Sequence, residues 1–457
     1  MAPPMTSNSN NGSVFAGLFG WFVLLHMWKQ LPLDEPLGVT AVRILAVGAA
    51  IGLVLRPHHL GALAATAGGV VLCVLAQLPW MSNSWMTAGC LSFAVLGGAA
   101  AAWRTGGRTT DAAWPAIRPG IAVGLVAFYV FASLCKLNVD FFTAERSCAV
   151  AFYSELARDL PLPQTPWSAQ LAMWATAIIE VGIPISLVVP RTRTAGIVVG
   201  VLFHAFIAIS ARVHIYDYSL LMYVGYIAFA PDDLHHVLRT DPSLRVFRAV
   251  VDRTPLLLAA LFGVGTVTAL ASVGTDWFRV LLVRALVWDV LAAGFIGVAL
   301  VAAVRCTGPN GTLAPALRLP WAWLTVALIT LNGISPYIGL KTTVAFTMFS
   351  NLRTEAGVAN HLFVPRVPLF GFQDEVLHVE RTTLPIRTDD VAWLPFTLRS
   401  FATTHPDATI AYRLHGDPTL TYDGRLADDP RLNTPVHPVL GKVLSFRPIE
   451  LGAQCPW

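Results

Sequence analysis

The sequence predicts an all-α polytopic membrane bundle of about nine to eleven spans, followed by a small β-rich domain outside the membrane. Hydrophobic residues make up 55% of the 457 residues and charged residues only 13%, and the mean hydropathy is +0.61. A soluble protein of this length carries more charge. Several of the 14 tryptophans stand at the ends of apolar runs, where bilayer interfaces collect them. The lipid bilayer is therefore the first expected partner.

About eleven apolar runs approach the length needed to cross a ~30 Å hydrocarbon core as helices. They occupy residues 14–28, 38–55, 60–80, 85–103, 117–135, 168–189, 194–211, 215–230, 255–274, 280–304 and 320–340. The predicted membrane domain is thus 13–340. Residues 1–12 precede it without a positively charged segment, which indicates a disordered N-terminus and not a cleaved signal peptide.

Basic residues are unequally shared between two sets of loops. Loops after even-numbered runs contain Arg56, Arg104, Arg108, Arg118, Arg191, Arg193, Arg239, Arg245, Arg248, Arg253, Arg305 and Arg318. Loops after odd-numbered runs contain fewer, namely Lys29, Arg146, Arg158, Arg212 and Arg279. Because basic residues collect in cytoplasmic loops, we expect a cytoplasmic N-terminus and an extracytoplasmic chain after Leu340.

Several classes of function are not indicated. No basic segment interleaved with aromatic residues predicts nucleic-acid binding, no cysteine and histidine cluster predicts a metal site, and no glycine-rich loop predicts nucleotide binding. Six cysteines in a chain of this length do not form a disulfide framework. Only Cys148 and Cys455 lie outside by the expected orientation, where disulfides persist, so these two are expected to bond. The oligomeric state is left open.

The loop between residues 136 and 166 has a helical pattern of its own. Apolar side chains recur at Val150, Tyr153, Leu156 and Leu160, between charged positions. This spacing predicts an amphipathic helix that either roofs a membrane cavity or packs on its neighbours.

Residues 341–457 differ in composition from the membrane domain. Proline, threonine, aspartate and arginine become frequent, and strand-like segments appear at 375–384, 409–416 and 419–424 with turn signals between them. The segment contains too many aromatic and aliphatic residues for a disordered tail. It predicts a small extracytoplasmic β-rich domain.

Ionisable residues at or within predicted spans are candidates for function because burying them is costly. Lys136 directly follows the uncharged run 121–135, Glu180 lies in the middle of a run, and His204 lies within the apolar sequence VLFHAFI at 201–207. Lys136 either reaches the headgroups or acts as a base. Glu180 either serves function or accepts a structural hydrogen bond, and His204 is either functional or a packing residue.

A basic role for Lys136 sets two conditions. Its pKa must fall from about 10.4 toward neutrality, which burial would favour. Asp140, one turn further on, must point away toward water or Arg146, because a nearby carboxylate favours the charged ammonium.

The last predicted span ends in a segment, 336–365, that is rich in aromatic and polar residues. Met348 and Phe349 stand beside Asn351 and Arg353, a mixture that suits a flat apolar ligand with polar oxygens. A polar collar at the headgroups is the alternative interpretation.

Four of these strings resemble one family. KLNVDFF at 136–142 resembles the Lys-Leu-Asp/Asn-x-Asp-Trp string of vitamin K-dependent gamma-glutamyl carboxylase and its bacterial relatives with the horizontally transferred transmembrane (HTTM) domain. FTMFSNLR at 346–353 resembles the family's Trp-x-Met-Met-Val-His-Ser-Arg string. His204 and the segment 214–233 that follows it resemble the family's helix pair. Glu180 stands where the family has an acidic residue before a run of small residues, and the strings occur in the same order as in the family. The resemblance covers roughly residues 10–400.

The resemblance implies a membrane carboxylase or epoxidase, a lyase-type enzyme that uses a reduced naphthoquinone of the vitamin K or menaquinol type, O2 and CO2. Lys136 would be the catalytic base, and Glu180, His204, Asn351, Arg353, Met348 and Phe349 would bind quinone or substrate. The substrate would be a peptide or a small-molecule carboxyl compound. Lys136, Glu180, His204 and Arg353 are expected to line one cavity near the outer leaflet.

The sequence departs from the family pattern at three places. Residues 82–84 read Ser-Asn-Ser where the carboxylase has a histidine, Asn351 replaces a histidine, and the long lumenal region is missing after Leu340. An alternative function is therefore a non-catalytic HTTM protein that binds or moves a lipid or quinone, or that acts as a membrane assembly partner.

Overall fold

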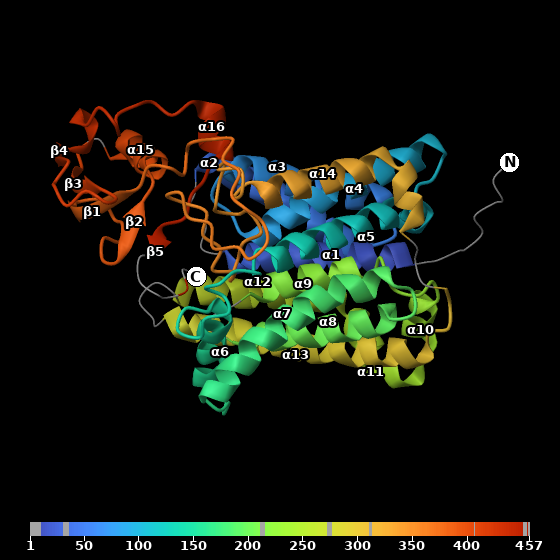
Figure 1. Cartoon of the computed structure of the whole chain (residues 1–457). Helices are drawn as coiled ribbons and strands as arrows, with labels where there is room; N and C mark the ends of the chain where they lie inside the picture. The colour runs from blue at the N-terminus through green and yellow to red at the C-terminus, as the bar shows by residue number, and fades with distance from the viewer. Residues whose placement is uncertain are drawn as a thin grey trace.

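The computed structural model describes residues 11–30, 36–210, 215–271, 277–309, 313–405, 407–450 and Cys455. It is mostly helical, with a small sheet near the C-terminus (Figure 1). Residues 1–10 of the predicted disordered N-terminus lie outside the described residues, and the first helix already begins at Asn11.

The first five helices form one half of the bundle. They are α1 (Asn11–Lys29), α2 (Leu37–Leu55), α3 (Leu60–Gln77), α4 (Asn83–Arg104) and α5 (Thr110–Leu134). Side-chain caps define two of their starts: Ser82 Oγ accepts from Trp85 N at 3.2 Å, and Thr109 Oγ1 accepts from Ala112 N at 3.2 Å. These caps fix where α4 and α5 enter the bundle.

Nine further helices complete the bundle among the residues that the structure describes. They are α6 (Cys148–Asp159), α7 (Pro166–Val188), α8 (Arg193–Ile207), α9 (Tyr216–Tyr226), α10 (Leu234–Thr240), α11 (Arg245–Val251), α12 (Thr254–Ala271), α13 (Trp277–Arg305) and α14 (Pro320–Ile334). A capping box between Thr165 and Ser168 starts α7. α14 packs against α4 and α5, whereas α13 packs against α8 (Figure 1).

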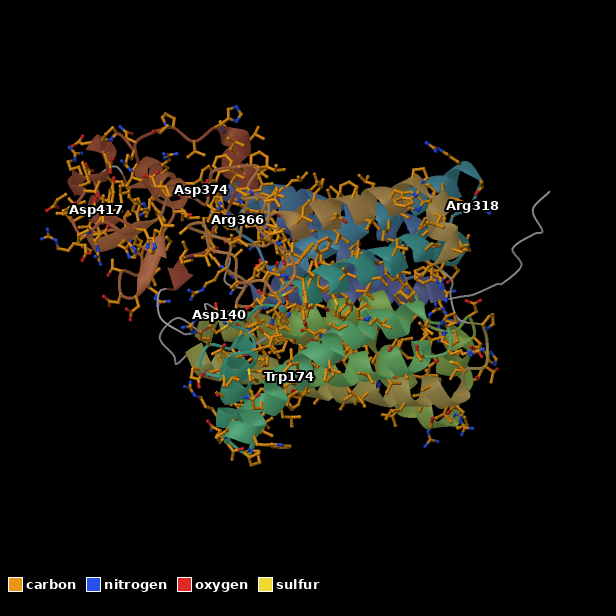
Figure 2. All side chains as sticks on the ribbon, viewed as in Figure 1. Asp140, Trp174, Arg318, Arg366, Asp374 and Asp417 are labelled. Atoms are coloured by element: carbon orange, nitrogen blue, oxygen red, sulfur yellow. A yellow bond between two sulfur atoms is a disulfide. The ribbon has the colours of Figure 1, made fainter. Side chains whose placement is uncertain are left out.

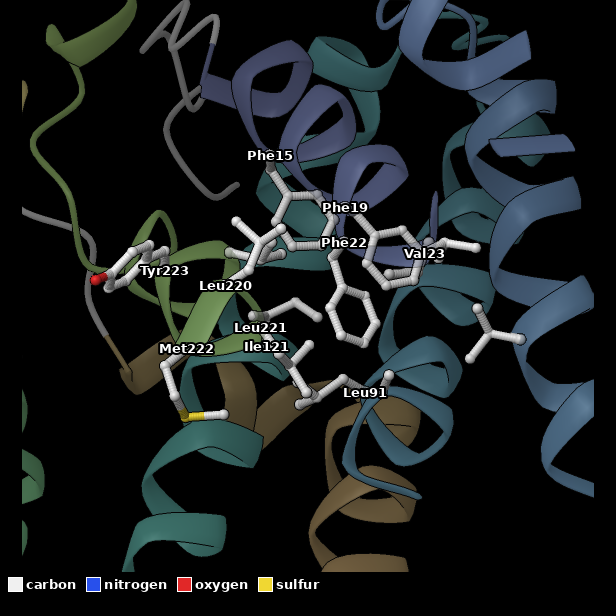
Figure 3. Close-up of a cluster of buried hydrophobic side chains, with 14 of the residues drawn as sticks. Phe15, Phe19, Phe22, Val23, Leu91, Ile121, Leu220, Leu221, Met222 and Tyr223 are labelled. Carbon is white, nitrogen blue, oxygen red and sulfur yellow. The ribbon is translucent and has the colours of Figure 1, made fainter. Parts of the chain in front are cut away.

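The core is built around α1. Phe15, Phe19 and Phe22 of this helix are buried and face Ile121 of α5 and Leu220 of α9 (Figure 3). α1 contacts α2, α5 and α9, so it is enclosed by protein on several sides. A helix that is apolar around most of its circumference is expected in such a central position.

Six helical segments among the described residues are long and apolar enough to cross a membrane. They are α2, α3, α4, α5, α7 and Leu282–Arg305 of α13. Apolar segments in α8, α12 and α14 are shorter. Large apolar side chains such as Leu45, Leu72 and Ile178 are exposed on these helices, as in a bundle surrounded by lipid. The multi-pass membrane bundle is confirmed in this coarser form.

The amphipathic helix predicted after Lys136 is present as α6. Its Ala149 packs with Met173 and Ala177 of α7, and Leu156 is also buried. Its polar face carries the exposed Arg158. The contacts with α7 agree with the second of the two interpretations, a helix that packs on its neighbours.

The C-terminal domain contains a five-stranded antiparallel sheet in the order β4-β3-β1-β2-β5. Its strands are β1 (Leu377–Thr382), β2 (Val391–Trp393), β3 (Thr409–Leu414), β4 (Tyr422–Arg425) and β5 (Ile449–Glu450). The three predicted strand segments correspond to β1, β3 and β4. Two short helices, α15 (Pro395–Thr404) and α16 (Pro438–Val443), accompany the sheet. Figure 1 shows the sheet at one end of the bundle, called here the domain end.

A disulfide joins the start of α6 to the C-terminal segment. Cys148 and Cys455 are bonded, with their Cα atoms 4.8 Å apart, which confirms the predicted pair. Cys73, Cys90 and Cys135 are free and buried. The bond ties the domain end together covalently across 307 residues of sequence.

We expect peptide mapping of the unreduced protein to recover one linked peptide containing Cys148 and Cys455. Cys73 and Cys90 should react with an alkylating reagent only after unfolding, because they are buried. Cys455→Ser should release Cys148 as a free thiol. Recovery of free Cys148 from wild-type protein kept without reductant would contradict the bond.

Candidate functional site

Lys136 and Glu180 form a buried ion pair at the domain end. The Lys136 Nζ lies 2.8 Å from Glu180 Oε2, and the two side chains are only 6% and 13% exposed. Lys136 Nζ also donates to the carbonyl of Ala132 at 3.1 Å, and Ser133 Oγ donates to the Glu180 carbonyl at 2.8 Å. The end of α5 is therefore joined to the middle of α7 by both side-chain and backbone groups.

The charge state of Lys136 corrects one sequence-based condition. Burial alone lowers the pKa of the ammonium group, but the Glu180 carboxylate outweighs burial and holds the pKa above its usual range. The resting amine is therefore protonated, not neutral as a lone lysine base requires. The physical reason is the partner on α7, which lies 44 residues away in sequence and was not paired with Lys136 from the sequence.

Asp140 points away from Lys136, as a basic role for this lysine required. It accepts from Arg146 Nη1 at 2.8 Å and from Asn360 Nδ2 at 2.8 Å, and Arg353 Nε lies 3.7 Å away. Burial raises the pKa of Asp140, but these donors outweigh it and the pKa lies below its usual range. Figure 2 shows Asp140 at the domain end, with Arg318 at the opposite end. Arg353, one of the predicted ligand-binding residues, therefore lies beside Asp140.

His204 belongs to a hydrogen-bonded chain of ring side chains. Its Nε2 lies 2.7 Å from the Tyr129 hydroxyl, and that hydroxyl is in turn hydrogen bonded to the Tyr226 hydroxyl. Ser219 Oγ donates to the His204 carbonyl at 2.9 Å. The His204 Nδ1 is buried without a hydrogen-bond partner in the described structure. Tyr129 and Tyr226 were not predicted, because tyrosines within apolar runs are indistinguishable from packing residues.

The predicted ligand-binding residues after α14 mainly make structural contacts, namely hydrogen bonds to backbone groups and packing against neighbouring side chains. Asn351 Oδ1 accepts from Cys148 N at 2.7 Å, and its Nδ2 donates to the Arg146 carbonyl at 2.7 Å. The Phe349 ring contacts Phe152 of α6 edge to face at 5.2 Å, and Met348 packs against the main core. Asn351 therefore uses both amide ends on backbone groups, which suits a structural brace.

The backbone between residues 344 and 356 adopts an unusual conformation. Val344, Phe346, Phe349, Asn351 and Ala356 have positive φ angles of 53° to 59°. Such angles cost about 1–3 kcal/mol each for residues other than glycine, so the surroundings must enforce them.

Hydrogen bonds from three helices hold this strained segment. Asn83 of α4 accepts from Phe346 N at 3.0 Å, and Asn332 of α14 donates to the Val344 carbonyl at 2.8 Å. The Cys135 thiol, directly before Lys136, donates to the Phe346 carbonyl at 3.3 Å. The segment is thereby fixed beside the end of α5, although no periodicity in the sequence indicates this.

A second buried polar cluster surrounds Asp217, at the start of α9, and was missed from the sequence. Asp217 is 1% exposed and bonds His26 Nδ1 at 2.8 Å, Lys29 Nζ at 2.7 Å and Ser84 Oγ at 2.9 Å. The His26 ring stacks on Trp85 with ring centroids 4.2 Å apart. The available signal was an aspartate within an apolar run, combined with a histidine and a lysine three residues apart at the end of the first run.

The opposite end of the bundle contains a cavity of about 270 Å³. Apolar side chains of α1, α8, α9 and α13 form its walls, including Leu18, Val201 and Phe295, and Tyr226 also lines it. Arg239, Arg248 and His235 add positive or titratable groups to its lining, and Asp252 adds one carboxyl group. None of the site residues predicted from the sequence lines this cavity, so it is separate from the Lys136–Glu180 pair.

We expect Asp217→Ala to destabilise the protein by about 3–5 kcal/mol, because it leaves the buried His26 and the partly buried Lys29 without their shared carboxylate. Thermal unfolding of the detergent-solubilised protein measures the loss. The control is Asp423→Ala, which removes an exposed ion pair to Arg381 and should cost no more than about 1 kcal/mol. Equal, small losses for both variants would argue against a stabilising Asp217 cluster.

Comparison with known proteins finds no match: no protein-family model, curated protein or solved structure is significantly similar to this chain. The resemblance to the carboxylase family therefore depends on short strings alone. The chemistry of the site has to be argued from its own geometry, foremost from the buried pair of Lys136 and Glu180.

Proposed function

We propose that this protein is a membrane-embedded enzyme that transfers a proton at the Lys136–Glu180 pair during carboxylase- or epoxidase-type chemistry with a reduced naphthoquinone. The observation that carries the proposal is the pair itself: an ammonium and a carboxylate from two helices, 2.8 Å apart and largely withdrawn from water. Buried ionisable groups within membrane bundles are costly and are typical of functional sites. The short strings shared with the carboxylase family support the choice of ligand.

In the proposed mechanism the two residues of the ion pair share the role of the base: Glu180 accepts the proton and Lys136 stabilises the resulting negative charge. A carboxylate offers about four lone-pair positions, so Glu180 can accept a ligand proton while it remains beside Lys136. The Lys136 ammonium then stabilises the negative charge left on the ligand, and its attraction is stronger in a site with little water. A reduced naphthoquinone would supply an acidic hydroxyl and, with O2 and CO2, the oxidation and carboxylation steps.

The residues around the pair suit a flat aromatic ligand. Cys135, directly before Lys136, bonds the backbone of Phe346, and the Phe346 ring contacts Phe128 edge to face at 5.0 Å. Aromatic walls with few polar groups are typical of sites that bind apolar cofactors. Asn83 and Asn332 hold the strained backbone at Phe346 and Val344, so in the proposed site the Phe346 ring would form a fixed wall.

A second candidate function is binding or movement of a lipid or quinone without chemistry, or service as an assembly partner. The cavity of about 270 Å³ at the opposite end favours the binding role, because its apolar walls and basic lining suit an amphipathic molecule with an anionic headgroup. This role requires neither the Lys136 amine nor Glu180, which gives the two candidates different mutational signatures.

The proposed placement in the membrane has an extracytoplasmic domain end and a cytoplasmic N-terminus, with nine to eleven spans. The distribution of arginine supports this orientation, and the Cys148–Cys455 disulfide agrees with an oxidising compartment at the domain end. The shorter apolar segments in α8, α12 and α14, together with α1 and α9 in two of the predicted runs, would add to the six longer spanning segments.

We expect Lys136→Ala and Glu180→Gln each to reduce quinol-dependent epoxide formation by about 10²–10⁴-fold, the usual contribution of a positioned acid or base. Lys136→Arg should retain part of the activity if Glu180 accepts the proton, because guanidinium still stabilises negative charge. The assay follows epoxide by chromatography in proteoliposomes supplied with naphthoquinol and O2. Arg158→Ala, which alters an exposed ion pair at the same end, serves as the unaffected control.

Substitution of Lys136 or Glu180 alone leaves the other residue with a buried, unpaired charge, which can itself destabilise the protein. Folding must therefore be tested separately. The double variant Lys136→Met/Glu180→Leu removes both charges together and is expected to fold like wild type and remain inactive. Full activity in this folded double variant would eliminate the pair as the reacting site. Retained lipid binding without any wild-type epoxidation would favour the second candidate.

A further inference from the structure

The chain between α14 and the sheet exposes a dense set of apolar side chains. In residues 362–370, called here the apolar loop, every exposed residue is apolar: Leu362, Phe363, Pro365, Val367, Pro368, Leu369 and Phe370. Phe363 and Leu369 are 74% and 69% exposed. The one charged residue, Arg366, is paired with Asp374, and its side chain is only 10% exposed. Exposed apolar patches of this kind mark contact with a membrane or with another protein.

The apolar loop lies level with the ends of two helices of the bundle. Leu362 N donates to the carbonyl of Leu137, which follows α5, at 2.9 Å. Val367 N donates to the carbonyl of Tyr337, which follows α14, at 2.9 Å. Because α5 is long and apolar enough to span the membrane, its end marks the level at which the hydrocarbon core meets the headgroups. The apolar loop is therefore held at this boundary.

The backbone of the apolar loop has little need of water. Its two prolines have no N–H group. Six other N–H groups donate to acceptors within the protein, namely those of Leu362, Phe363, Val364, Val367, Leu369 and Phe370. A non-helical segment can lie beside hydrocarbon only where its polar backbone groups are satisfied by the protein. The apolar loop meets this condition for most of its length.

His361 organises the start of the apolar loop. Its Nδ1 accepts from Phe363 N at 3.0 Å and from Val364 N at 2.8 Å. Its Nε2 donates to the carbonyl of Leu134, the last residue of α5, at 2.8 Å. One imidazole ring thus satisfies three backbone groups and fixes the exposed Phe363 next to the end of α5.

The short helix α16 of the C-terminal domain has a second apolar surface. Val439, Leu440 and Val443 are exposed, and their spacing of three and four residues places them on one face of the helix. None of the residues of α16 is buried against the domain. The helix is therefore held by few contacts of its own and presents its apolar face outward.

The surroundings of α16 continue the lipid-facing surface of the bundle. Lys442 Nζ donates to the carbonyl of Ala76, in the last turn of α3, at 3.3 Å. Leu72 and Leu75, on the same spanning helix, are exposed. Figure 1 shows α16 beside the end of α3 at the domain end. Because the neighbouring exposed surface belongs to membrane-spanning helices, lipid is the occupant that this position favours.

We propose that the apolar loop and α16 insert into the lipid leaflet at the domain end and hold the C-terminal domain against the membrane surface. Their apolar side chains enter the boundary between headgroups and acyl chains, as do amphipathic segments that lie in the interface. The domain is then attached in three ways: by the chain after α14, by the Cys148–Cys455 disulfide and by lipid. This attachment does not depend on the chemistry proposed at Lys136 and Glu180.

The first test uses the full-length protein without substitution, in phosphatidylcholine vesicles whose acyl chains carry a photoactivatable diazirine. Light converts the diazirine to a carbene that inserts into nearby side chains, and peptide mass spectrometry locates the adducts. We expect adducts in the apolar loop and α16, as on the exposed side of α3. Residues 409–425 should carry none, because they include β3 and the edge strand β4, which lies far from the bundle (Figure 1).

The second test measures depth with a fluorescent label on Phe363→Cys or Val439→Cys. Leu420→Cys is the matched control, because Leu420 is also exposed but lies between β3 and β4. Each variant also carries Cys306→Ser, which removes the free cysteine that is not buried among the described residues. Quenching by nitroxides on the acyl chains should place labels 363 and 439 about 5–10 Å inside the headgroup boundary. Iodide in the water should quench the label at 420 instead.

Equal iodide quenching at positions 363 and 420, or the absence of lipid adducts from the apolar loop and α16, would overturn the proposal. Labels protected from both iodide and the nitroxide lipids would show that protein, such as a second copy of this chain, covers the surface, and this would overturn it too. The photolabelling of the unsubstituted protein decides if a variant fails to fold. Neither experiment contains a quinol, so a failed epoxidation assay leaves both results valid.

Discussion

The ion pair between Lys136 and Glu180 is the interaction on which the domain end depends. It joins the end of α5 to the middle of α7, and the residues next to it continue the connection: Ser133 to the Glu180 backbone and Cys135 to the backbone of Phe346. A charge withdrawn from water requires a partner at fixed geometry, so the pair sets the distance between the two helices. The strained segment after α14 is then fixed against α5.

Much of the fold could be predicted from the sequence, because it depends on local pattern. Apolar runs located the helices, the spacing around Leu156 located α6, and alternating residues located β1, β3 and β4. The direction of Asp140 and the Cys148–Cys455 bond also agreed with expectation. The short β2 and β5 were missed because two or three residues are too few to show a period.

The candidate site was only partly predictable, since partners across helices leave no periodic signal. Lys136 and Glu180 were each noted as costly inside a bundle, but their mutual pairing, and with it the protonated state of Lys136, came from the packing of α5 on α7. The Asp217 cluster was missed for the same reason. Asn351 has a bracing position that its residue type alone does not distinguish from ligand binding.

The disulfide also constrains how the chain threads the bilayer. Cys148 and Cys455 can bond only on one face of the membrane, so the segment between them must cross an even number of times. The two long spanning segments in this interval, α7 and Leu282–Arg305, satisfy that parity. With the shorter apolar segments of α8, α12 and α14 the count would be five, so either α9, which lies in the predicted run 215–230, must cross as well or one of the three must not. Any revised count of crossings after α6 must therefore change in steps of two.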